Sequence, residues 1–144
     1  MAQASFYYNV ASREQALCQL VGKAVKRKLA TGVLTGNEAD SMAVDRLLWE
    51  IPSTGFVPHC LADQPVAAAT PAWIHHELDA LLPRDVLFNW SDQAVPADRG
   101  IARIVEIVPR DDDGLRQIAR QRLAYYKQAG YEIEFTDMLQ LAKG

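Results

Sequence analysis

Hydrophobic positions along this chain follow two alternating spacings, and these spacings predict alternating strands and helices. Short runs rich in aromatic and β-branched residues, such as residues 5–10 and 101–108, are typical of buried strands. Between such runs, apolar residues recur every three or four positions, which is typical of helices that bury one face. The predicted strands are 5–10, 33–35, 72–75, 85–90, 101–108 and 131–135, and the predicted helices are 12–31, 37–51, 111–128 and 137–142.

Residues that favour helix ends support these boundaries. Ser12 with Gln15 forms a capping box, and Asn37 with Asp40 looks like a second helix start. The predicted stops of the three long helices are Gly32, Pro52 and Gly130. We interpret residues 53–71, which are punctuated by proline, alanine and glycine, as a long loop with a fragment of strand. The alternation predicts a single α/β domain over residues 1–144, with a mostly parallel sheet flanked by helices.

Composition limits the class of protein. A chain of 144 residues with 49% hydrophobic and 23% charged residues is long enough for one domain with a real core, and its balance is that of an ordinary soluble protein. The net charge of −3 excludes a global attraction to nucleic acid. Cys18 and Cys60 do not make a disulfide framework, and the chain shows neither a membrane-length apolar run nor a signal-peptide pattern. We therefore expect a cytoplasmic protein.

Residues suited to catalysis are present but form no recognisable site. The glycines at 22 and 36 fit neither a phosphate loop nor a dinucleotide-binding fingerprint. The histidines and Cys60 lack the paired spacing of a zinc site, and the serines stand without the motifs that surround nucleophiles. These candidate residues are Ser53, His59, Cys60, His75, His76 and Ser91. We predict no catalytic residue, no metal and no cofactor; the alternative is a nucleotide-binding or hydrolytic α/β domain with an unrecognised site.

The helix predicted at 111–128 carries a basic ridge. At about 100° per residue, Arg116, Arg120 and Lys127 fall within about 40° of one another, with Leu123 exposed in the same stripe. Arginine can grip a carboxylate with two parallel hydrogen bonds, so such a ridge suits an acidic partner that ends in a hydrophobic group. From the pattern alone, a solvated helix face is the simpler interpretation.

Other basic residues have different expected roles. Arg122 points into the opposite, core-directed arc of the same helix, so it needs a buried partner. The candidate partners are Glu106 and Asp85. A second basic patch, formed by Lys23, Lys26, Arg27 and Lys28, is most simply a solvated helix face. Direct binding of DNA through the basic patches is a third hypothesis, which the net charge argues against as the main activity.

Several motifs together resemble a known family. They are Ser5–Tyr8, Leu47–Pro52, Gly55–His59, Val105–Pro109, Arg116–Arg122 and Ala129–Ile133, with Tyr126 between the last two. In this order and at this spacing they resemble the chi subunit of bacterial DNA polymerase III over nearly the whole chain, with a weak stretch from about 62 to 83. The resemblance implies a nucleotide-binding-like (Rossmann-like) fold and a non-catalytic accessory subunit associated with the clamp loader.

The resemblance also implies two binding surfaces. One would hold the acidic C-terminal tail of the single-stranded-DNA-binding protein, through Val108, Arg116, Arg120, Leu123 and Lys127. The other would contact the psi subunit, which links chi to the clamp loader, through Trp49, Pro52, Phe56 and Pro58. Some family members have an aromatic residue where this chain has Leu123, and Ala124 follows without a positive charge, which bears on the strength of tail binding. DNA would be reached mainly through the single-stranded-DNA-binding protein.

Overall fold

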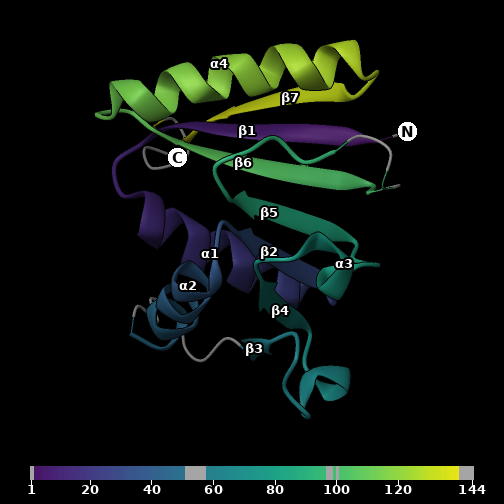
Figure 1. The fold of residues 1–144 in the computed structure, drawn as a ribbon. Helices are drawn as coiled ribbons and strands as arrows, with labels where there is room; N and C mark the ends of the chain where they lie inside the picture. The colour runs from purple at the N-terminus through teal and green to yellow at the C-terminus, as the bar shows by residue number, and fades with distance from the viewer. Residues whose placement is uncertain (1, 51–57, 97–98, 100, 140–144) are drawn as a thin grey trace.

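A computed structural model describes residues 2–50, 58–96, 99 and 101–139 of the chain. Seven parallel strands form one sheet in the order β3-β4-β2-β5-β6-β1-β7 (Figure 1). The strands are β1 Gln3–Val10, β2 Thr31–Thr35, β3 His59–Leu61, β4 Ala72–His75, β5 Val86–Trp90, β6 Arg103–Pro109 and β7 Glu132–Asp137. The helices are α1 Arg13–Lys26, α2 Glu38–Glu50, α3 Leu78–Leu81 and α4 Asp113–Gln128, with a 3-10 turn at Ala67–Ala69. The predicted α/β class with a parallel sheet is confirmed.

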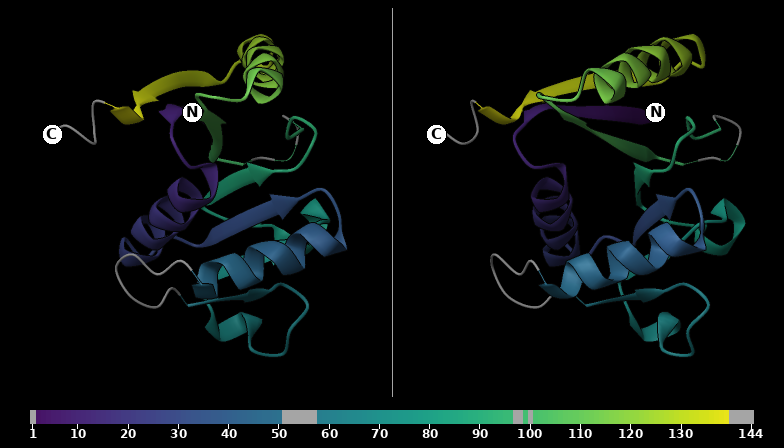
Figure 2. Two further views of the ribbon diagram at one scale, coloured as in Figure 1. Left: turned by 90° about the vertical axis from the view of Figure 1, so that its left-hand side faces the viewer. Right: turned by 60° about the vertical axis from the view of Figure 1, so that its left-hand side comes forward.

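The helices cover both faces of the sheet. The chain runs from β1 across to β2 and β3, and then returns through β4 toward β7. Because crossovers between parallel strands are right-handed, this reversal of direction places the two sets of helices on opposite faces. One core accordingly joins α1 and α2 to the sheet, and a second core joins α3 and α4 to its other face (Figure 2). Among the described residues, no helix combines the length and the hydropathy of a membrane span.

Both predicted helix starts are confirmed, but one predicted stop is wrong. Ser12 Oγ accepts a hydrogen bond from Gln15 N at 3.2 Å, and Asn37 Oδ1 accepts one from Asp40 N at 2.8 Å. Gly32, however, lies inside β2; α1 ends at Lys26, and Lys28 closes the turn with a φ of 62°. A Cβ at position 32 would lie 3.0 Å from Leu87 Cδ1, so the glycine allows close packing between neighbouring strands and does not mark a helix end.

The remaining differences concern short or irregular segments. The predicted fragment of strand within 53–71 is β3, while the four-residue α3 was not expected, because so short a helix has no readable periodicity. The predicted stop at Pro52 and most of the helix expected at 137–142 lie outside the described residues. In β7, Tyr131 just before the strand is buried and Ile133 is half-buried, but Phe135 is 57% exposed. The apolar stripe of β7 is therefore only partly covered.

A buried polar network ties α4 to the sheet. Arg122 Nη1 donates to Glu106 Oε1 at 2.7 Å, which confirms Glu106 rather than Asp85 as its partner. Tyr126 Oη and Asn89 Nδ2 donate to the other carboxylate oxygen at 2.7 and 2.6 Å. Burial raises the pKa of Glu106, and the neighbouring Arg122 guanidinium opposes that rise. Since Arg122 also donates to Ser91 O at 2.8 Å, the network fixes the rotation of α4 about its axis.

Candidate functional site

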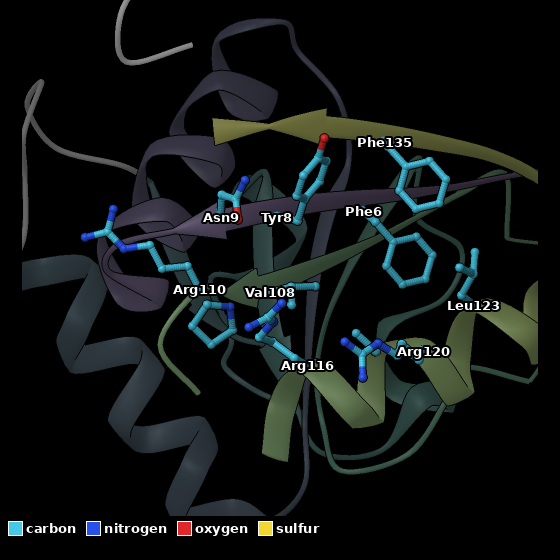
Figure 3. Close-up of a pocket in the computed structure, with 11 residues that line it drawn as sticks. Phe6, Tyr8, Asn9, Val108, Arg110, Arg116, Arg120, Leu123 and Phe135 are labelled. Atoms are coloured by element: carbon cyan, nitrogen blue, oxygen red, sulfur yellow. The ribbon is translucent and has the colours of Figure 1, made fainter. Parts of the chain in front are cut away.

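A groove of about 370 Å³ lies between α4 and the carboxyl ends of β6 and β1, beside β7 (Figure 3). Its lining comes from four elements and the turn after β6: Phe6, Tyr8, Asn9, Val108, Pro109, Arg110, Arg116, Ala119, Arg120, Leu123 and Phe135. In Figure 3, Arg116 and Arg120 project from α4 on one side, while Tyr8 and Phe135 project from strands on the other. The groove therefore combines an apolar wall of strand residues with a basic wall of helix residues.

The apolar wall is built from aromatic rings on neighbouring strands. Phe6 and Phe135 are paired in register across β1 and β7, and their ring centroids lie 6.0 Å apart. Tyr8 stands edge-on to Phe135 at 6.3 Å. Tyr8 and Phe135 remain 36% and 57% exposed, which is unusual for large apolar side chains that touch one another. Such an uncovered aromatic cluster is typical of a surface that binds another molecule.

Three arginines border the groove, and they differ in whether a carboxylate already pairs with them. Arg116 Nη1 lies 3.7 Å from Asp113 Oδ1, and Arg110 Nε lies 3.3 Å from Asp111 Oδ2. These carboxylates are exposed, so the two ion pairs are weak and leave both guanidinium groups able to take another partner. Arg120 has no carboxylate within 4.0 Å among the described residues. The groove thus offers one unpaired and two weakly paired cations to an anionic ligand.

Comparison with known proteins identifies the family. The model of the family described as DNA polymerase III chi subunit, HolC, matches residues 1–134 of the 144-residue chain. The chain belongs to the DNA polymerase III chi subunit family. The chain is 27% identical to DNA polymerase III subunit chi of Pseudomonas aeruginosa, an alignment covering 93% of this chain and 95% of that protein. The subunit of the same name from Escherichia coli is 26% identical over 83% and 82% of the two chains. Family membership makes the chain a chi accessory subunit with a role in DNA replication.

Four of the five residues predicted for tail binding come together in the groove of this chi subunit. Val108, Arg116, Arg120 and Leu123 all line it. Leu123 is half-buried and packs against the core beneath α4, rather than exposed as the helical pattern predicted. Lys127 is exposed but is not part of the lining. The structure therefore divides the predicted set into groove residues and one outlying charge.

The groove also contains residues that sequence reasoning missed. Phe6, Tyr8 and Phe135 read as ordinary strand residues, although Phe6 and Tyr8 are two positions apart and so share a face. Asn9 has a φ of 59° at a bulge in β1, and its Nδ2 donates to Asp137 Oδ1 at 3.1 Å. Asparagine tolerates this left-handed conformation better than most residues. The asparagine at position 9, near the end of the predicted strand, was therefore the only indication of the bulge in the sequence.

Of the predicted psi-binding residues, Trp49 and Pro58 are described, whereas Pro52 and Phe56 lie outside the described residues. Trp49 is 56% exposed at the end of α2, and its ring packs against the buried His59 with centroids 5.1 Å apart. Met42, two turns earlier on the same helix, is 58% exposed. Helix α2 therefore presents two large apolar side chains outward, which a monomer gains nothing by exposing.

One group of possible metal ligands lies among the described residues, but its two histidine rings are not arranged to share one ion. Donor atoms of His75, His76 and Glu77 lie within 4.8 Å of one another. The two rings, however, stack at 4.5 Å with an interplanar angle of 13°, so their in-plane lone pairs run parallel instead of converging on one ion. Burial raises the pKa of Cys60, and raises that of Cys18 to about 11, so both thiols stay protonated at neutral pH and are poor nucleophiles.

A second cavity, of about 310 Å³, lies outside the carboxyl ends of β2 and β5. Doubly wound sheets bind nucleotides at such a position, where the chain leaves adjacent strands toward opposite faces. Its lining contains Gly36 after β2 and Asp92 after β5, and the guanidinium of Arg99 in its wall is paired with Asp79. A carboxylate and a neutralised arginine do not suit a phosphate, and we assign no ligand to this cavity.

Proposed function

We propose that the groove captures the acidic C-terminal tail of the single-stranded-DNA-binding protein and thereby couples that protein to the clamp loader of the replicase. The observation that carries the proposal is the convergence of Val108, Arg116, Arg120 and Leu123 on one groove with exposed aromatic walls. A chain of net charge −3 that gathers three arginines around an apolar groove is suited to a ligand with both acidic and hydrophobic parts.

The proposed binding mode assigns the two walls to different parts of the tail. Arg120, which has no ion-pair partner among the described residues, takes the terminal carboxylate with two parallel hydrogen bonds. Acidic side chains further back in the tail meet Arg116 and Arg110. The terminal apolar side chain packs between Leu123, Val108 and the Phe6–Phe135 pair. Helix α4 needs no rearrangement, because the buried network already holds it with Arg116 and Arg120 facing the groove.

Fluorescence anisotropy with a labelled tail peptide from the same organism's single-stranded-DNA-binding protein tests the proposal. We expect saturable binding that weakens as salt rises, because the contact is charge-assisted. Removing the terminal residue of the peptide should abolish it, since that residue supplies both the carboxylate and the buried side chain. A scrambled peptide of equal charge is the control. Absence of binding at about 100 μM protein, a concentration at which even weak contacts register, would exclude the proposed function.

We further propose that the surface around Trp49 contacts the psi subunit or another component of the clamp loader. Its support is the exposure of Trp49 and Met42 two turns apart on one face of α2, with Pro58 adjoining in sequence the segment that holds Pro52 and Phe56. Large exposed aromatic side chains are the usual anchors of protein interfaces.

Trp49→Ala should lower retention of clamp-loader subunits on the immobilised chain by about tenfold or more, because interface tryptophans often contribute above 2 kcal/mol. Val66→Ala is the control, since Val66 is 59% exposed and lies outside α2, in the segment between β3 and β4. Tail-peptide binding should be the same in both variants. Equal retention of the two variants would remove Trp49 from any such interface.

A further inference from the structure

A second concentration of positive charge lies on the face of the sheet opposite the groove. Four cations follow one another at the end of α1, and a fifth, Arg103, comes from the start of β6. We call this set the α1 basic patch; it consists of Lys23, Lys26, Arg27, Lys28 and Arg103. A third of the 15 lysines and arginines of a chain with net charge −3 are thus gathered on one surface.

Hydrogen bonds hold the guanidinium of Arg103 on the same surface as the cations at the end of α1. Its Nε donates to Ser5 Oγ at 3.2 Å, and its Nη2 donates to Tyr7 Oη at 3.1 Å. Lys23, Arg27 and Arg103 together border a pit of about 30 Å³ whose floor is apolar. Because the pit joins residues of α1 to residues of β6 and β1, Arg103 adds a charge from a second element to those at the end of α1.

The usual explanation for basic residues at the end of a helix does not account for the patch. Cations in a last turn interact favourably with the helix dipole, and Lys23 and Lys26 satisfy that description. Arg103 lies on a strand, and its hydrogen bonds are to hydroxyl groups rather than to a carboxylate. None of the five cations has a carboxylate within 4.0 Å among the described residues. Among the residues that the structure describes, the patch is therefore a surface of positive charge without an ion-pair partner.

We propose that the α1 basic patch binds the phosphodiester backbone of DNA directly. A backbone of repeated phosphates needs several cations on an open surface and no deep pocket, and Lys23 and Arg27 are one helical turn apart, about 6 Å along the axis. The pit is too small for a peptide side chain, which distinguishes it from the groove of about 370 Å³. A lipid surface would require large apolar side chains beside the cations, and the exposed large hydrophobic residues of the described chain do not lie on α1.

The patch and the groove are placed so that both can be occupied together. Arg103 and Val108 lie near opposite ends of β6, five residues or about 17 Å apart along the strand. Their side chains leave opposite faces of the sheet, as do Tyr7 beside the patch and Phe6 in the groove. A DNA contact at the patch would therefore add to tail capture rather than compete with it, and it does not depend on the tail proposal.

Binding of fluorescein-labelled oligothymidylate and of a labelled duplex, measured by anisotropy at several salt concentrations, tests the proposal. We expect weak binding at low salt, with a slope of log K against log salt no steeper than about −3.5 for the single strand, since five cations can neutralise at most five phosphates. Arg27→Glu should lower the affinity about tenfold and reduce the slope by about 1. Comparison of the two probes shows whether single-stranded or duplex DNA is preferred.

Arg46→Glu is the matched control, because Arg46 is exposed on α2, does not border the pit, and undergoes the same change of charge. The affinity of the Arg46→Glu variant for DNA should stay within about twofold of that of the unchanged protein. Binding of the tail peptide should be unchanged in both Arg27→Glu and Arg46→Glu. Three results would overturn the proposal: no DNA binding at about 100 μM, equal losses in Arg27→Glu and Arg46→Glu, or equally tight Arg27-dependent binding of polyglutamate.

Discussion

Replacing Arg122 with alanine should destabilise the protein by about 3–5 kcal/mol, the usual cost of leaving one member of a buried ion pair without its partner. Arg122 and Glu106 are only 8% and 3% exposed, so the Glu106 carboxylate would stay buried without its counter-charge. The variant would keep the hydrogen bonds from Asn89 and Tyr126 to Glu106 but lose the positive charge that balances the carboxylate. Urea unfolding followed by circular dichroism measures the change.

Two further variants separate the charge from the packing. Glu106→Gln/Arg122→Met removes both charges and keeps much of the volume, and it should recover at least about half of the loss, because no buried charge is then unpaired. Arg120→Ala, an exposed change on the same helix, should alter stability by less than about 0.5 kcal/mol. An Arg122→Ala variant that unfolds with less than about 1 kcal/mol of destabilisation would show that the pair contributes little in solution.

The position of helix α4 could be predicted nearly completely from the sequence. A 16-residue helix gives its periodicity many positions in which to appear, and its two faces differ sharply in charge. Arg122 was the single exception on the core-directed face, and burial of a charge requires a partner, so the sequence already limited the choice to nearby acids. Glu106 was one of two candidates, with Asp85, and the structure decides between them. The basic wall of the groove follows from these features.

The aromatic wall could not be predicted in the same way. Alternation in β1 and β7 indicates which residues share a face, but not whether a helix covers that face. Phe6 is 3% exposed and Phe135 is 57% exposed, although the two are paired in register on adjacent strands. The difference arises from where α4 lies above the sheet, which is a tertiary property. The prediction that Gly32 ends the first helix was wrong for a related reason. The position of Gly32 is explained by close packing against Leu87 on the neighbouring strand, which the local sequence does not show.

Arg120→Ala should lower the affinity for the tail peptide by about tenfold to a hundredfold, which corresponds to the 1.5–3 kcal/mol of a hydrogen bond to a charged group. Arg120 lines the groove and has no competing carboxylate among the described residues, so its charge is available to the ligand. Arg120→Lys should give an intermediate loss, because an ammonium group keeps the charge but cannot make two parallel hydrogen bonds. Anisotropy titrations at one salt concentration give the three affinities.

The variant Lys127→Ala distinguishes direct contact in the groove from long-range electrostatic attraction to the whole of α4. Lys127 carries the same charge and lies on the same helix, but it does not line the groove. A specific contact predicts a change below about threefold at Lys127, because a surface charge without direct contact is largely screened at physiological salt. Equal losses at the two positions would mean that the tail is attracted to α4 as a whole. The terminal carboxylate would then have to be placed elsewhere on the ridge that the sequence pattern predicts, and the groove would be left to hold only the apolar end of the tail.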